Sequence, residues 1–120
     1  LSMQRMLYAA KDEKDAKEKN KLAYEYYKRF DNVFTGPGKV KEGEIEPLPR
    51  KQSLQELTQN LLICPPSEMI DKLSIYAEAG VDEIIISAGF GQSQNEMIDS
   101  MHRISEEVIP YFKKFSSKVA

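Results

Sequence analysis

The residues of this chain that could do chemistry stand where short apolar runs end. Cys64 closes one run, Ser87 closes another, and Gly89 and Gly91 follow directly. A thiol acts as a nucleophile when a base or a positive charge lies near it. Glycines let the backbone approach a phosphate closely, although two glycines without the rest of a nucleotide-binding motif are a weak signal. A buried, packed thiol and a flexible turn are the alternatives to a cofactor-binding site.

A second set of candidates lies between Asp31 and Gln52, a stretch rich in glycine and proline without apolar periodicity. Such long loops in compact domains are commonly active-site lids or disordered segments. Four cations of this stretch could meet anionic groups at a closed site: Lys39, Lys41, Arg50 and Lys51. The alternative is a solvated loop in which Glu42, Glu44 and Glu46 offset their charges.

The other ionisable residues favour simpler interpretations. The charged run over 11–21 has mixed signs, which is typical of a solvated helix face. His102, the only histidine, stands one position off an apolar helical stripe and is expected to be exposed. Asp82 and Glu83 face opposite sides of an expected strand, so they form no carboxylate pair. With one cysteine and one histidine, we expect no metal site and no disulfide framework.

Composition bounds the class of protein. The 120 residues fit one domain, and 41% hydrophobic with 30% charged residues is ordinary for a globular protein. The formal net charge of -2 gives no reason to expect nucleic-acid or membrane binding, and no apolar run approaches a membrane span. The first residues lack a signal-peptide pattern and an initiator methionine, which predicts a processed, cloned or truncated chain. The single cysteine favours a reducing, cytoplasmic setting.

Apolar periodicity predicts the elements that carry these residues. We expect strands over 4–10, 60–64 and 84–86, and helices over about 12–30, 53–59, 66–80 and 93–112. Ser53 and Ser93 each stand three residues before a glutamate, which is the capping-box pattern. Pro110 should kink the last helix or end its regular part near Val108. Three successive strand–helix units predict an α/β fold with parallel strands, about three-eighths of a (β/α)8 barrel. The three isoleucines over 84–86 predict a strand that is buried on both faces.

Three stretches of the chain resemble one known family. Residues 64–87 resemble the penultimate and last strands of the bacterial luciferase-like flavin-dependent monooxygenases: CPPSEMIDKLSIYAEAGVDEIIIS. Residues 96–114 resemble the family's C-terminal helix, and residues 6–30 resemble its preceding strand and helix. The resemblance implies that residues 1–120 are a single C-terminal segment of a TIM barrel, about its last three β/α units. Cys64-Pro65-Pro66 departs from the family's Gly, Ser or Thr, then Pro, so the next helix loses its side-chain cap.

The resemblance also implies a function for the whole protein. It implies an enzyme that uses reduced FMN and O2 on an organic substrate, or a deazaflavin-dependent oxidoreductase of the same superfamily, with a mobile lid at 31–52. Because the family takes most flavin contacts from preceding strands, we expect the isolated segment to bind no flavin and to be inactive. The alternative is a non-catalytic α/β module that keeps the strands for assembly.

The expected sheet also predicts association. Three parallel strands cannot close a barrel, so two sheet edges are expected to be open, and open edges pair with other chains. We therefore expect a homo-oligomer, most simply a two-fold dimer. Candidate contacts are Tyr24, Tyr26, Tyr27 and the C-terminal helix.

Overall fold

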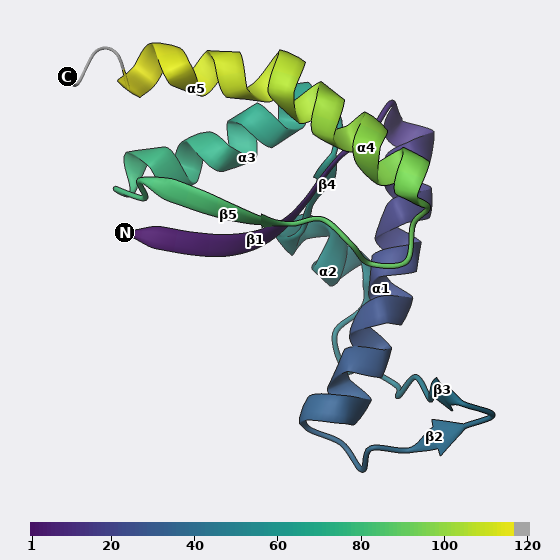
Figure 1. Ribbon diagram of the computed structural model, residues 1–120. Helices are drawn as coiled ribbons and strands as arrows, with labels where there is room; N and C mark the ends of the chain where they lie inside the picture. Colours follow the sequence, from purple (N-terminus) through teal and green to yellow (C-terminus); the bar gives the residue numbers. More distant parts are fainter. Residues whose placement is uncertain (117–120) are drawn as a thin grey trace.

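The chain folds around a parallel sheet whose central strand comes first in the sequence (Figure 1). The computed structural model describes the backbone of residues 1–116 and the side chains of residues 1–113. β1 (Ser2–Ala9) lies between β4 (Leu62–Cys64) and β5 (Glu83–Ser87), and both neighbours run parallel to it. The α/β class with parallel strands is confirmed.

The strand order differs from that of consecutive barrel units. β5 pairs with β1 along residues 2–6, whereas β4 pairs only with residues 7–9. Successive strands of a barrel lie side by side, so β4 would stand between the other two. With only three residues, β4 is too short to separate the longer strands, and β5 pairs with β1 directly. Three consecutive barrel units are therefore not the arrangement of this sheet.

α1 (Glu13–Phe34) starts beyond the carboxyl end of β1 and is longer than the sequence predicts. Asp12 is its N-cap, and the Asp12 side chain accepts a hydrogen bond from the Asp15 amide. α2 (Leu54–Asn60) begins with the predicted capping box. Both helices share one core with the sheet: Met6, Tyr8, Ala10, Ala16, Ala23, Leu57, Leu61, Ile63 and Phe90.

The opposite face of the sheet packs against α3 (Pro66–Glu78) and the C-terminal helices. The second core consists of Leu7, Ala9, Leu62, Cys64, Met69, Leu73, Ile104 and Val108. Gly80 follows α3 with a φ of +95°, as the predicted glycine stop requires. No side chain caps the start of α3, as the prolines at 65 and 66 predict.

The C-terminal helix contains a π turn in place of a simple kink. It consists of α4 (Gln94–Arg103), the π turn η1 (Ile104–Val108) and α5 (Ile109–Ser116). In η1 the Ile109 amide donates to the Ile104 carbonyl, five residues back. Pro110 has no amide hydrogen, and this wider turn accommodates it without ending the helix.

Residues 35–52 form an arm at the far end of α1, away from the sheet (Figure 1). The arm contains a short antiparallel hairpin, β2 (Val40–Lys41) with β3 (Glu44–Ile45). The loop predicted over 31–52 therefore begins only after α1 ends at Phe34, and part of it is regular structure.

Asn32, which is fully buried, holds the arm against the end of α1. Its side-chain amide donates to the carbonyls of Lys39 over 2.8 Å and of Glu46 over 2.6 Å. Its side-chain oxygen accepts from the Lys39 amide over 2.9 Å. One side chain thus satisfies backbone groups on both sides of the hairpin, which a stretch without apolar periodicity needs for order.

Candidate functional site

A buried polar cluster lies at the carboxyl end of β1, near the first turns of α1 and α4. The Tyr8 hydroxyl donates to Asp15 Oδ2 over 3.1 Å, and the Lys11 amide donates to the same oxygen over 3.0 Å. Lys19 Nζ donates to Asp15 Oδ1 over 2.9 Å and forms an ion pair with Glu96 of α4. Ligands of parallel α/β sheets bind at the carboxyl ends of the strands, so this edge is the natural place for a site.

Burial and hydrogen bonding set the charges of this Asp15 cluster, defined as Tyr8, Asp15, Lys19 and Glu96. Burial, helped by the Asp15 charge, raises the pKa of Tyr8 to about 12. Burial would also raise the pKa of Asp15, but hydrogen bonds from Lys19, the Lys11 amide and Tyr8 outweigh it and lower the pKa. Burial would lower the pKa of Lys19, yet its hydrogen bonds to Glu96 and Asp15 raise it. The Lys19 hydrogen bond is also the main cause of a lowered Glu96 pKa.

The Asp15 cluster is better suited to holding structure than to moving protons. A general acid or base works best with a pKa near the ambient pH, whereas Tyr8 and Lys19 are shifted upward and Asp15 downward. The Lys19 ammonium also lies 5.5 Å from the centre of the Tyr8 ring. The cluster therefore fixes the start of α1 against α4 at the edge of the sheet.

A second set of contacts ties α4 to the end of β1. Ser100 Oγ accepts a hydrogen bond from the Ala9 amide over 2.9 Å, and Arg103 Nε donates to the Ala9 carbonyl over 2.7 Å. Both backbone groups of the last β1 residue are thus used by one helix. Arg103 Nη2 is buried and makes no hydrogen bond, which leaves a free donor at this edge.

The turn after β5 is occupied by packing and by its own hydrogen bonds. Phe90 is 2% exposed and meets Tyr8 edge-on, with ring centroids 5.8 Å apart. Gln92 accepts from the Phe90 amide and donates to a carbonyl within the same turn. Gly91 has a φ of +110°, a conformation that favours glycine, and it lies against Leu22 of α1. Its role is therefore to allow the turn. Gly89, the other phosphate candidate, lies in the same turn, where an added Cβ would stand 3.8 Å from the Met97 sulfur.

Cys64 and Ser87 lie on opposite sides of β1 and are not brought together. The Cys64 thiol is 2% exposed, and burial raises its pKa to about 12 in spite of the nearby charge of Lys72. This environment favours packing over nucleophilic chemistry. Ser87 is half-buried at the end of β5, in register with Met6.

The four candidate lid cations lie far from the Asp15 cluster. α1 has 22 residues, a length of about 33 Å at the usual helical rise, with the cluster near its start and the arm at its end (Figure 1). Arg50 turns back to α1, where its Nε lies 3.4 Å from Asp31 Oδ2 and its guanidinium covers the Tyr27 ring. The other three cations are exposed: Lys39, Lys41 and Lys51. In this conformation the arm does not cover the carboxyl edge.

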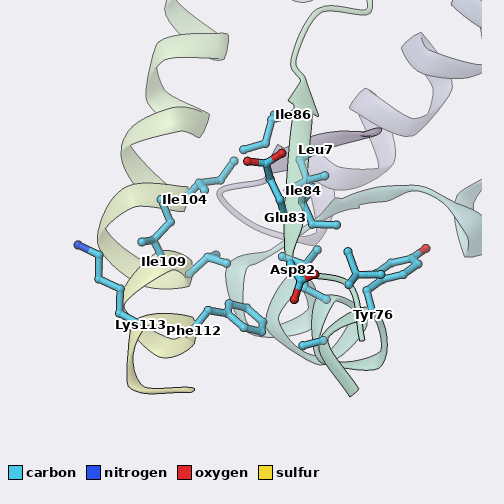
Figure 2. Close-up of a pocket in the computed structure, with 14 residues that line it drawn as sticks. Leu7, Tyr76, Asp82, Glu83, Ile84, Ile86, Ile104, Ile109, Phe112 and Lys113 are labelled. Atoms are coloured by element: carbon cyan, nitrogen blue, oxygen red, sulfur yellow. The ribbon is translucent and has the colours of Figure 1, made fainter. Parts of the chain in front are cut away.

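An apolar groove lies beside β5, between α3 and α5 (Figure 2). Its volume is about 740 Å³, and its lining includes Ile84 and Ile86 of β5 and Ile109 and Phe112 from the C-terminal helix. Ile86 is 43% exposed, and Ile85, on the opposite face, is 51% exposed. The prediction that this strand is buried on both faces is therefore wrong. β5 is an edge strand, and neither of the two cores extends to Ile85 or Ile86.

The Asp15 cluster is difficult to predict from the sequence, because Asp15 and Lys19 lie within the charged run over 11–21. The interpretation of that run as a solvated face is wrong for Asp15 and Lys19, which are each 6% exposed. The spacing of Lys19 from buried alanines is the one feature of the sequence that could have predicted its burial. Lys19 stands three residues after Ala16 and four before Ala23, on the buried stripe of the helix.

Comparisons with protein-family models, with curated proteins and with solved structures find no match for this chain. Within residues 1–116, no helix combines the length and hydropathy that a membrane crossing needs. The same described residues bring together no group of three metal-binding side chains. The resemblance to the luciferase-like family remains a prediction from the sequence.

Proposed function

We propose that this chain is the C-terminal part of a luciferase-like flavin-dependent monooxygenase that uses reduced FMN and O2 on an organic substrate. The proposal begins from the resemblance of residues 64–87 and 96–114 to that family. The observation that supports it best is the part of one sheet face that α1 and α2 leave uncovered. There Ile85 is 51% exposed, and Gln4, its partner in register, is also exposed. In a (β/α)8 barrel that inner face is lined by the remaining strands.

The pairing of β1 with β5 suits two neighbouring strands of such a barrel. They run parallel along residues 2–6 and 83–87, and α3 with the C-terminal helices covers the face opposite Ile85. β4 would then be a short addition at the carboxyl edge rather than a barrel strand. In this proposal the segment supplies two barrel strands instead of the three that the sequence predicts.

The proposed role of the segment is to close the barrel rather than to hold the flavin. The Asp15 cluster and Arg103 fix α1 and α4 at the carboxyl edge, where barrel enzymes bind their ligands. Because Phe90 fills the turn after β5, we assign the FMN phosphate to residues outside this chain. As a lid that excludes water, the arm would have to move toward the carboxyl edge.

Turnover by the complete protein that contains these residues tests the proposal. We expect it to consume O2 and reduced FMN in the presence of an organic substrate, and we expect the 120-residue chain alone to be inactive. A reduced deazaflavin in place of FMN identifies the deazaflavin-dependent variant. A complete protein that uses neither reduced cofactor would rule out this function.

A non-catalytic α/β assembly module is the second candidate. The open edge of β5 and the apolar groove favour it, because they offer surface to a macromolecular partner. The two functions differ in one simple property, since an assembly module binds its partner and takes up no flavin.

A further inference from the structure

β5 is an edge strand that lacks the usual protection of an edge. Natural edge strands are blocked by lysine, proline, a bulge or a covering element. Residues 83–87 contain no lysine and no proline, and their single charge, Glu83, stands at the first position. They pair with β1 in an unbroken register. Ile85 and Ile86 are 51% and 43% exposed on opposite faces. The edge therefore offers unpaired backbone groups together with apolar surface to another strand.

The residues of β5 are complementary to themselves in antiparallel pairing. With Ile85 on a two-fold axis, Ile84 lies opposite Ile86 of the second copy, and Glu83 lies opposite Ser87. The pairing places isoleucines against each other and a hydroxyl against a carboxylate, and no like charges meet directly. A second copy of this chain therefore matches the edge in both shape and charge.

The apolar groove beside β5 adds buried surface to a dimer interface that strand pairing alone would leave too small. A stable interface buries about 1,600 Å² in total, more than two five-residue strands provide. A two-fold axis perpendicular to the sheet places the grooves of both copies on the same face, next to the joined edges. Ile109 and Phe112 of the groove then lie near the interface and extend it beyond the strands.

We propose that this chain forms a two-fold dimer in which the β5 strands of two copies pair antiparallel about Ile85. The two three-stranded sheets then form one continuous sheet. This inference rests on the second candidate function, the assembly module, because a β5 edge that pairs with a second copy cannot also pair with another strand of a barrel. Its test has no flavin readout, so its failure is distinguishable from that of the flavin function.

Disulfide cross-linking tests the register of the pairing. Opposite residues of an antiparallel pair have Cα atoms about 4.5–5.5 Å apart, within the range that a disulfide bridges. Ile85→Cys should therefore give a covalent dimer of twice 13.7 kDa on mild oxidation. Ile75→Cys is the matched control, since Ile75 is 66% exposed on α3, and it should stay uncross-linked. The native Cys64 is 2% exposed and should not compete.

A charge at the axis tests the same contact without a covalent bond. Ile85→Lys places two like charges opposite each other and should weaken the dimer at least about tenfold in sedimentation, whereas Ile75→Lys should have no effect. Circular dichroism shows whether each variant is folded. Equal cross-linking by both cysteine variants overturns the proposal. A second outcome also overturns it: the chain is monomeric, and the β5 amides are protected from hydrogen exchange only in the complete protein. Another strand of that protein would then cover the edge.

Discussion

Lys19 donates a hydrogen bond to Asp15 over 2.9 Å at a place where both side chains are 7% exposed. The two residues lie one turn apart on α1, and Glu96 of α4 completes the pairing of the ammonium. The buried pair joins two helices that are far apart in the sequence. It therefore links the start of α1 to the C-terminal part of the chain at the carboxyl end of β1.

Removing one partner of this pair should destabilise the protein strongly. Lys19→Met leaves the Asp15 carboxylate buried without its cation, and such a loss costs about 3–5 kcal/mol of the free energy of unfolding. Urea denaturation measures the loss. Lys17→Met, an exposed position on the same helix, is the control and should change stability little. Equal stability of the two variants would show that the pair contributes nothing.

Stability should fall in acid because the pKa values of Asp15 and Glu96 are lowered in the folded state. A lowered carboxyl pKa stabilises the fold above the unfolded value of about 4, and this stabilisation disappears as the pH falls through the folded pKa. Urea denaturation at a series of pH values below about 5 should show the decline. The double variant Asp15→Asn with Glu96→Gln should be less stable at neutral pH and less sensitive to acid. Parallel pH profiles for the two proteins would be inconsistent with this assignment.

The Cys64 thiol should be nearly unreactive while the protein is folded. It is 2% exposed, and burial raises its pKa to about 12, so little thiolate is present and little reagent reaches it. A chromogenic disulfide reagent should react slowly in buffer and rapidly in urea, and Cys64→Ser should abolish the reaction. Fast stoichiometric labelling of the folded protein would instead support the nucleophile interpretation.

Asn32→Ala should loosen the arm without unfolding the sheet. The change removes hydrogen bonds to both sides of the hairpin, each with a net value of about 1 kcal/mol. Hydrogen exchange should become faster at Lys39 and Glu46 and stay unchanged in β1. Asn95→Ala, at an exposed asparagine of α4, is the control. Unchanged exchange in the arm would mean that the hairpin does not depend on this side chain.

Helix ends could be predicted from the sequence because they depend on neighbouring residues. Both capping boxes form at Ser53 and Ser93, and Gly80 follows α3 in the left-handed conformation. The sequence predicts the end of α1 too early, because Asn32, which holds that end, bonds to backbone groups of a later segment. Local patterns contain no information on such a partner.

Strand order and the Asp15 cluster could not be predicted in the same way. β4 and β5 are both short apolar runs, and which of them pairs along β1 depends on their length and on the helices around them. Lys19 is buried because Asp15 and Glu96 neutralise it, and Glu96 lies on another helix. Composition alone makes a lysine within a charged run look solvated.

Equilibrium titration of FMN tests the central claim most directly, by comparing the complete protein, the isolated 120-residue chain and the complete protein without this segment. Flavin fluorescence reports binding in all three. We expect FMN quenching by the complete protein at micromolar concentration, and no quenching by the isolated chain or by the truncated protein. In the proposed function the segment closes a barrel whose other strands hold the flavin, so neither part alone forms the site. Absence of FMN and deazaflavin binding by the complete protein, or full-affinity binding by the truncated one, would contradict this account.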